Sequence, residues 1–292
     1  MEKSDFLKLN PMLLYEVSKP FDNKDYIFEL KFDGIRALIF INKGKIIIKS
    51  RRGIILNDIY PELLDIKNLS EDVCIFDGEI VLIKNGKPSF SKLQERMKLK
   101  NDVLISHMKE NEPVVFVCFD ILYKNKDLTT TKLIKRKEIL NKFQDSNVFM
   151  KSLYVENNGI KLFDFVKKEG LEGIIAKKKA SFYTYGKRTD AWLKIKNYRV
   201  EDFYVCGYIK NKNDTLSIIL GELKNNKYYT VGKVLMGNKN PLYKKIIKEN
   251  KVDNYLENYK ELNSFFIKAK YKIAINYLER TKNNYLREPR IK

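Results

Sequence analysis

The chain has 292 residues, of which 44% are hydrophobic and 32% charged, a composition typical of a folded protein with one large domain or two smaller ones. It contains no apolar run near the roughly 18 residues that span a bilayer, and its first residues, MEKSDFLKLN, lack the apolar core of a signal peptide. We therefore expect a cytoplasmic protein of bacterial or viral origin, with no membrane partner.

The net charge of +20 favours a polyanionic partner, because a large excess of lysine and arginine attracts phosphate groups and releases their counterions. Nucleic acid is the partner class that fits this charge. A lysine-rich proteome encoded by an AT-rich genome would give the same composition without such a partner, and composition alone does not separate the two.

Three cysteines, Cys74, Cys118 and Cys206, are widely spaced in apolar surroundings and form no C-x-x-C pair. This pattern argues against a disulfide framework and against a zinc site, so we expect buried free thiols. A single histidine, His107, leaves little room for a multi-histidine metal site.

Residues 25–124 consist mostly of short apolar runs rich in β-branched and aromatic residues, which predict strands: YIFEL, RALIFI, KIIIKS, DVCIFDGEIVLI and PVVFVCFDILY. Helical periodicity follows at 130–143 and at 159–170, where the final glycine suits a helix C-cap. Strands resume at EGIIAK (172–177) and AWLKIK (191–196). We expect this first part, residues 1–198, to be an α+β domain.

The pattern changes after residue 198. Four runs, EDFYVCGYIK, TLSIILGEL, KYYTVGKVL and FFIKAKYKIAINYLER, predict short antiparallel strands joined by Asn- and Gly-rich turns, and NPLYKKIIKEN (240–250) predicts one helix. Several short strands in so few residues suit a small barrel such as the nucleic-acid-binding OB-fold. We therefore expect a second domain at 199–292.

The segment ELKFDGIRAL (29–38) carries a candidate nucleophile. Lys31 lies in a predicted strand and precedes Asp33 and Gly34, a pair that favours a tight turn, with Arg36 close behind. An amine must lose its proton to attack, and partial burial and nearby cations lower the pKa of a lysine. An exposed strand lysine before a turn explains the segment taken alone equally well.

Further motifs follow in order: SRRG (50–53), FDGEI (76–80), FVCFDILY (116–123), EGIIAK and GKRTDAWLKIK (186–196). In this order and spacing they resemble the motif series of the covalent nucleotidyltransferases, and most closely the ATP-dependent DNA ligases. The resemblance extends from PMLLYEVSKPF near the N-terminus to YLREPR, nearly the whole chain. It implies an adenylation domain with mostly antiparallel sheets and flanking helices, followed by an OB-fold β-barrel.

The resemblance also implies an activity: sealing of 5′-phosphate/3′-hydroxyl nicks in duplex DNA through a lysyl-AMP and a DNA-adenylate. ATP and Mg²⁺ or Mn²⁺ would be the cofactors, and nicked double-stranded DNA the partner of a monomer. Lys31 would attack the α-phosphate of ATP, and Asp33 would assist the later sealing step. Glu29 is similar to the residue that accepts a hydrogen bond from the adenine amino group, and Arg36 to the residue that binds the ribose.

Other roles follow from the same resemblance. Phe119 would stack on one face of adenine and Ile175 would close the other. Glu79 and Glu172 would lie around the ribose and the metal ion, which needs one or two carboxylates. The expected phosphate contacts are Arg51, Arg188, Lys194 and Lys196, and the two lysines, on one strand face, would lower the pKa of Lys31.

Each role has a structural alternative: an exposed strand residue for Glu29, a turn former for Asp33, ion pairs for Glu79 and Glu172, and a core aromatic for Phe119. Two other enzymes, an RNA ligase and a GTP-using capping enzyme, share much of the motif series, and a non-catalytic DNA-end-binding protein would also retain it. The pathway, whether replication, repair or end joining, and the protein partners stay open.

The sequence departs from the family pattern at its end. Family members continue past the LR.P segment into an R-x-D-K motif, which orients pyrophosphate during self-adenylation. Here YLREPRIK ends the sequence, and the aspartate is missing. Either the sequence is cut short, or Arg290 and Lys292 substitute for the motif, and we expect the first step to be affected.

Overall fold

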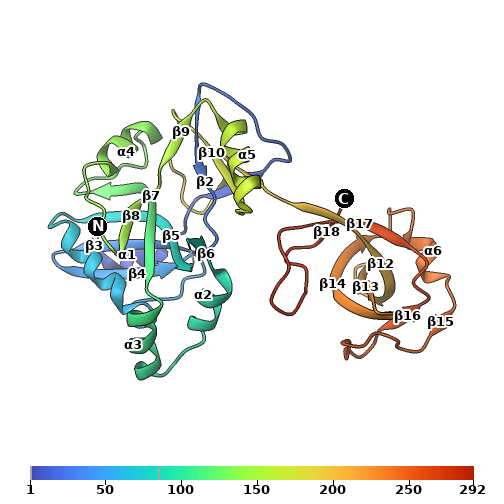
Figure 1. The fold of residues 1–292 in the computed structure, drawn as a ribbon. Helices are drawn as coiled ribbons and strands as arrows, with labels where there is room; N and C mark the ends of the chain where they lie inside the picture. Colours follow the sequence, from blue (N-terminus) through green and yellow to red (C-terminus); the bar gives the residue numbers. More distant parts are fainter. Residues whose placement is uncertain (1, 85) are drawn as a thin grey trace. The chain divides into compact units, whose positions relative to one another are not determined.

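The computed structural model describes residues 2–84 and 86–292. The chain divides into two compact units, residues 1–196 and 197–292 (Figure 1). Within the described residues, the first unit contains two sheets and the second contains one. Among the described residues, no helix is both long enough and apolar enough to cross a bilayer.

One sheet of the first unit has the strand order β1 (Leu13–Glu16), β11 (Arg188–Lys196), β10 (Gly173–Lys178), β2 (Tyr26–Leu30) and β9 (Tyr154–Glu156). Only the β1–β11 pair is parallel. Alternate side chains such as Phe28, Ile174 and Ala176 pack on one face against α5 (Gly159–Glu169). The predicted cap is confirmed, because Gly170 ends α5 with a left-handed φ of 66°.

The other sheet has the order β4 (Lys45–Ser50), β3 (Ile35–Asn42), β5 (Cys74–Lys84), β7 (Val114–Lys124) and β8 (Phe149–Lys151), with β6 (Lys87–Pro88) paired to β5. The largest buried apolar cluster lies here and includes Ile39, Phe76 and Phe116. The pairs β4–β3, β3–β5 and β5–β7 are antiparallel. The expected mostly antiparallel sheet with flanking helices is therefore confirmed for this unit.

The helices of the first unit only partly follow the sequence prediction. The helix expected at 130–143 is confirmed in a shorter form as α4 (Leu133–Leu140). Four further helices were not predicted from the sequence: α1 (Lys3–Lys8), the 3₁₀ helix η1 (Pro61–Leu69), α2 (Phe90–Arg96) and α3 (Asp102–Asn111). All three cysteines are buried and free, as predicted.

The second unit is a sheet with the order β14 (Lys227–Gly237), β13 (Thr215–Lys224), β12 (Arg199–Lys210), β16 (Phe265–Ile267) and β15 (Lys251–Val252). The strand β17 (Lys272–Tyr277) pairs with β12 and with β18 (Arg290–Ile291). The predicted helix is the short α6 (Tyr243–Ile247). The predicted antiparallel strands are confirmed, although β12, β13 and β14, of 12, 10 and 11 residues, are longer than predicted.

A two-residue turn joins β13 to β14. Asn225 and Asn226 adopt φ angles of 48° and 58°, and Lys224 pairs with Lys227 across the turn. Positive φ at both central positions defines the type I′ turn, whose twist matches that of the flanking strands, and asparagine tolerates this region well. The sequence NN therefore fixes the register of this hairpin.

Candidate active site

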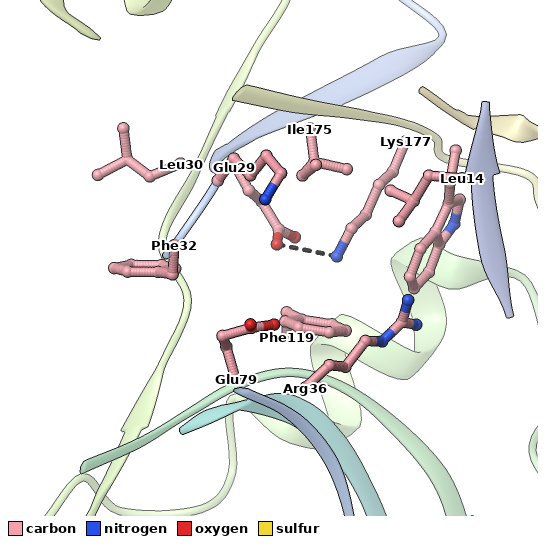
Figure 2. Close-up of a pocket in the computed structure, with 11 residues that line it drawn as sticks. Leu14, Glu29, Leu30, Phe32, Arg36, Glu79, Phe119, Ile175 and Lys177 are labelled. Carbon is pink, nitrogen blue, oxygen red and sulfur yellow. Dashed lines mark hydrogen bonds and ion pairs between the residues drawn. The ribbon is translucent and has the colours of Figure 1, made fainter. Parts of the chain in front are cut away.

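A pocket with a cavity volume of about 70 Å³ lies in the first unit, with walls from both of its sheets. In Figure 2, Glu29, Ile175 and Lys177 come from the sheet that contains β2 and β10, whereas Arg36, Glu79 and Phe119 come from β3, β5 and β7 opposite. Apolar and aromatic walls with a few charged groups are typical of small-ligand sites. Its lining residues are Leu14, Glu29, Leu30, Lys31, Phe32, Arg36, Glu79, Phe119, Ile175, Lys177 and Trp192.

Lys31 lies in this pocket directly after β2, and its Nζ is 2.8 Å from Oε1 of Glu172. Glu172 precedes β10 and is brought close because the backbone N–H of Lys31 donates to the carbonyl of Gly173 at 2.9 Å. A Cβ on Gly173 would lie 2.2 Å from the carbonyl oxygen of Ile195, and its φ is 157°. Glycine is therefore required at position 173. The close backbone approach that it permits keeps Glu172 beside Lys31.

Carboxylates, not cations, set the protonation of Lys31. Burial lowers the pKa of Lys31, but Glu172, Glu79 and Asp33 outweigh burial and hold the pKa above its ordinary value. The prediction that Lys194 and Lys196 lower this pKa is therefore wrong. Neither lysine lines the pocket, and Lys194 instead pairs with Glu16 at 3.2 Å.

Two half-buried carboxylates, Glu79 and Glu172, lie near the lysine. Burial raises the pKa of Glu79 to about 8, an effect that Lys31 and Arg36 only partly offset. Burial likewise raises the pKa of Glu172, against the opposing effect of Lys31. Oε2 of Glu172 is buried without a hydrogen-bond partner among the described residues, so this carboxylate has an oxygen available for a cation.

Glu29 is 2% exposed, and its carboxylate is surrounded by donors. Oε2 accepts hydrogen bonds from Lys177 at 2.9 Å and from the Ser152 hydroxyl at 3.1 Å. The Nζ of Lys137, on α4, lies 2.5 Å from Oε1 in an ion pair whose angles do not suit a hydrogen bond. Burial raises the pKa of Glu29, but the two lysines outweigh it, so the carboxylate is ionised.

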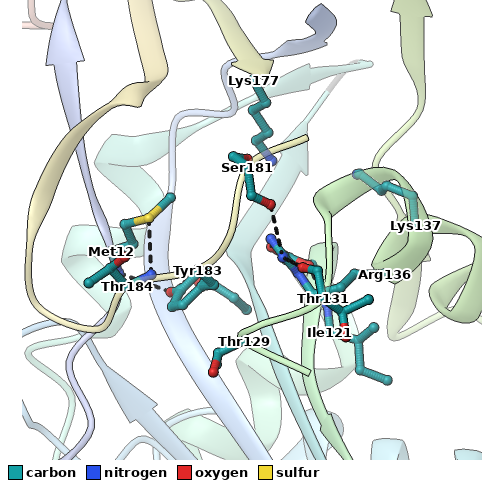
Figure 3. Close-up of polar contacts among 12 residues, drawn as sticks. Met12, Ile121, Thr129, Thr131, Arg136, Lys137, Lys177, Ser181, Tyr183 and Thr184 are labelled. Atoms are coloured by element: carbon teal, nitrogen blue, oxygen red, sulfur yellow. Dashed lines mark hydrogen bonds and ion pairs between the residues drawn. The ribbon is translucent and has the colours of Figure 1, made fainter. Parts of the chain in front are cut away.

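Arg36 is fixed by a buried chain of hydrogen bonds. Its guanidinium donates to both oxygens of Asp77 on β5, at 3.1 and 2.7 Å. The hydroxyl of Tyr183 also donates to Asp77, at 2.6 Å. The same hydroxyl accepts the backbone N–H of Met12 at 3.0 Å, and both of these residues are labelled in Figure 3. The guanidinium lies 5.3 Å from the centre of the Phe119 ring. The position of Arg36 in the pocket is therefore set by its ion pair with Asp77 and by its contact with Phe119.

Phe119 and Ile175, which were predicted to enclose a base, both line the pocket. Ile175 is the register partner of Glu29 across β10 and β2. Lys177, two residues further along β10, has its Nζ 4.3 Å from the ring centre of Phe119 and 4.2 Å from that of Trp192. Neither Lys177 nor Trp192 was proposed from the sequence, although both lie inside the quoted motifs.

The structure does not bring the four predicted phosphate contacts into the pocket lining. Arg51 is exposed after β4, and its backbone N–H donates to the carbonyl of Arg36. Arg188 is exposed on β11, and its guanidinium donates to the carbonyl of Leu14. Lys194 and Lys196 occupy the register positions opposite Ile175 and Gly173 on the neighbouring strand.

Solved structures share this fold. The structure of a mycobacterial DNA ligase D complexed with ATP and MES superposes with a TM-score of 0.61 at 22% identity, covering 98% of this chain and 96% of that chain. A structure of a Lig E DNA ligase gives a TM-score of 0.63 at 16% identity, covering 95% and 97%. The architecture is therefore the mixed α/β, nucleotidyltransferase-like fold of DNA ligases.

Sequence comparison agrees. Residues 11–196 match the family described as the ATP dependent DNA ligase domain. The chain is 33% identical over 206 residues to the SPbeta prophage-derived DNA ligase-like protein LigB of Bacillus subtilis, covering 69% of this chain and 72% of that protein. It is 30% identical over 202 residues to the multifunctional non-homologous end joining protein LigD of Mycolicibacterium smegmatis, covering 68% of this chain and 25% of that protein. The chain belongs to the ATP-dependent DNA ligase family, whose members are enzymes.

Proposed function

We propose that this enzyme seals 5′-phosphate/3′-hydroxyl nicks in duplex DNA through a lysyl-AMP on Lys31 and a DNA-adenylate. The observation that carries the proposal is the pocket position of Lys31, 2.8 Å from Glu172 and opposite Glu79 and Phe119. A lysine in a pocket with acidic and aromatic walls has the groups that nucleotide binding and phosphoryl transfer need.

In the first step, Nζ of Lys31 bonds to the α-phosphorus of ATP, the bond to the β-phosphate oxygen breaks, and pyrophosphate leaves. The ammonium must lose a proton before it attacks, because only the free amine has a lone pair. Glu172 Oε1, at 2.8 Å from Nζ, is within reach to accept that proton. Because the pKa of Lys31 is raised, the ammonium form is favoured, and the mechanism requires a group that accepts its proton.

The opposite end of the pocket suits a purine nucleoside. Glu29 offers an ionised acceptor to an amino group, and Phe119 and Ile175 supply apolar faces from opposite sheets. Arg36, held by Asp77, is positioned for the ribose. ATP is the nucleotide that the family uses.

Glu79 and Glu172 are the residues that would hold a divalent cation, Mg²⁺ or Mn²⁺. The fit rests on two half-buried carboxylates near Lys31. One of them, Glu172, has a buried oxygen, Oε2, with no hydrogen-bond partner among the described residues. Mg²⁺ takes one or two protein carboxylates and completes its shell with water and phosphate oxygens. Such an ion, when bound, neutralises negative charge on the transferring phosphate.

Further contacts belong to the later steps. We assign Asp33 to the sealing step, and Arg51, Arg188, Lys194 and Lys196 to phosphates of the nucleotide or of the DNA. Their positions outside the pocket lining suit an extended substrate better than the nucleotide alone. A fixed guanidinium fork is well matched to phosphate oxygens.

We further propose that residues 1–198 form the adenylation domain and residues 199–292 an OB-fold domain that helps to hold DNA. The division of the chain after residue 196 and the antiparallel strands of the second unit support this assignment. The second unit carries 20 lysine and arginine residues against 10 aspartate and glutamate residues, an excess that favours contact with phosphates.

Incubation with ATP and Mg²⁺, followed by intact mass measurement and peptide mapping, tests the first step. We expect one AMP on Lys31, none on the Lys31→Ala variant, and conversion of a 5′-phosphorylated nick to sealed product, with a 5′-hydroxyl nick left unsealed. An adduct on another residue, or no adduct, would refute the proposal. An adduct from GTP and not from ATP would support a capping-type enzyme.

A further inference from the structure

Lys49 is a buried lysine to which the proposed function gives no task. It lies on β4, is 2% exposed and does not line the pocket. Its Nζ donates to the backbone carbonyls of Phe6, Leu7 and Leu9, at 3.2, 2.7 and 2.5 Å. An ammonium has three donor hydrogens, so these three bonds satisfy it. Burial lowers the pKa of Lys49, which shows that placing the charge there is unfavourable.

The three carbonyls belong to the last turn of α1 and to the residue that caps it. The last carbonyls of an α-helix lack partners within the helix, and a cation beside them complements the negative end of the helix dipole. Phe6, from the same helix, stacks on Phe40 of β3 with 5.1 Å between the ring centres. Lys49 therefore fastens α1 to the sheet that contains β3 and β4.

The segment after α1 crosses to the other sheet of the first unit. The carbonyl of Asn10 accepts the backbone N–H of Gly186 at 2.8 Å, and β1 then pairs with β11. Leu14, on β1, is one of the pocket-lining residues labelled in Figure 2. Residues 2–14, named the N-terminal strap below, therefore connect the two sheets whose side chains form the pocket walls.

The N-terminal strap also bonds to the hydrogen-bond chain behind the pocket. The N–H of Met12 donates to the Tyr183 hydroxyl (Figure 3). That hydroxyl donates to Asp77, which holds Arg36 at the pocket wall. Because α1 lies outside residues 11–196, the family match does not account for its attachment by a lysine.

We infer that Lys49 is a positioning residue that keeps the N-terminal strap closed against the nucleotide pocket. The inference rests on the proposed function, in which the pocket holds ATP and then AMP. Opening of the strap would withdraw Leu14 from the pocket wall and break the tie between the two sheets, so the closed form binds the nucleotide more tightly. When only a fraction of the molecules is closed, the apparent affinity for the nucleotide falls by that fraction.

The test compares Lys49→Met with two control variants in the full chain. Lys45→Met removes an exposed lysine from the same strand, and Leu63→Ala opens a cavity in the largest apolar cluster, away from the pocket lining. The rate of adduct formation on Lys31 is measured by intact mass over a range of ATP concentrations, and stability by thermal unfolding.

Lys49→Met removes the donor from all three carbonyls. If the strap is then closed about a tenth of the time, KM for ATP rises about tenfold, while the rate at saturating ATP stays within about twofold of the parent rate because bound nucleotide closes the strap again. Lys45→Met should keep the parent KM, and Leu63→Ala should lower the melting temperature without a change in KM. An unchanged KM in Lys49→Met, or an equal rise in Leu63→Ala, would overturn the inference.

Hydrogen exchange gives a readout that needs no variant. We expect the amides of residues 9–14 to exchange about tenfold or more slowly in the AMP-charged enzyme than in enzyme discharged with pyrophosphate, because the nucleotide favours the closed strap. Equal exchange in the two forms would overturn the inference. An adduct on Lys31 then leaves the proposed function standing, whereas absence of any adduct with ATP refutes that function and the inference with it.

Discussion

Lys31 Nζ and Glu172 Oε1 lie 2.8 Å apart, although 140 residues separate them in the chain. The contact exists because Lys31 continues the β2–β10 pairing for one more hydrogen bond, to the carbonyl of Gly173. The carboxylate of the EGIIAK motif is thereby fixed beside the proposed nucleophile. Two effects on Lys31 can be measured separately: the effect of the Glu172 side chain, and the effect of the backbone geometry at Gly173.

Replacement of the Glu172 carboxylate tests its two proposed roles, proton acceptor and cation ligand. We expect Glu172→Gln to slow adduct formation on Lys31 by about a hundredfold or more, because the amide cannot accept the ammonium proton and is a weaker ligand for Mg²⁺ than a carboxylate. The melting temperature should fall only slightly, because the raised pKa of Glu172 shows that burial of its charge is unfavourable, which offsets part of the lost ion pair with Lys31. Glu16→Gln, which removes the partner of Lys194 outside the pocket, is the control; an equal slowing in both variants would contradict the role of Glu172.

The glycine beside Glu172 tests backbone geometry. We expect Gly173→Ala to destabilise the first unit and to slow adduct formation, because the added Cβ would meet the carbonyl oxygen of Ile195 at 2.2 Å. Gly44→Ala introduces a side chain at a φ of 73° with no atom within 4 Å and should cost only about 1 kcal/mol. Denaturant unfolding of both variants makes the comparison, and equal losses would show that close approach at Gly173 is unimportant.

The buried pair Arg136–Asp120 supports the wall from which Phe119 and Lys137 project. Its members are fully buried and bidentate, at 2.8 and 2.7 Å, and Arg136 also donates to the carbonyl of Thr131 (Figure 3). Arg136→Met leaves Asp120 charged without a partner and should cost about 3–5 kcal/mol of unfolding free energy. Lys135→Met, which removes an exposed pair with Glu138, should change stability by less than about 1 kcal/mol; a similar loss in both would contradict this ranking.

Nick binding should weaken steeply with salt. If lysines on both units neutralise DNA phosphates, the logarithm of the association constant falls linearly with the logarithm of salt concentration, by about 0.9 per phosphate contacted. Titration of a labelled nicked duplex between about 50 and 200 mM salt measures the slope. A slope near zero would show that the +20 charge reflects composition and not a DNA-binding surface.

Local patterns predicted much of the molecule. The strands at YIFEL, RALIFI and DVCIFDGEIVLI follow from β-branched and aromatic runs, and Gly170 from its position after an amphipathic helix. The short helices α2 and α3 escaped prediction because few of their side chains are buried, which leaves a weak apolar stripe. The resemblance to the ATP-dependent DNA ligase family was recognised from the ordered sequence motifs alone, without the structure.

The site was predicted less completely because its chemistry depends on pairing between distant strands. Strand alternation alone places Lys177 on the same face as Ile175, but its bond to Glu29 depends on the register between β10 and β2. The protonation of Lys31 depends in the same way on carboxylates of β5 and of the loop before β10. A motif list names these carboxylates without their distances, and the sign of the pKa change on Lys31 was therefore missed.

The walls of the pocket belong to two sheets, one built on β2 and β10 and the other on β3, β5 and β7. A nucleotide bound there would contact both sheets at once and would stabilise their packing against each other. Covalent attachment at Lys31 would make that junction permanent until DNA removes the nucleotide, so each catalytic cycle would alternately stiffen and loosen the first unit.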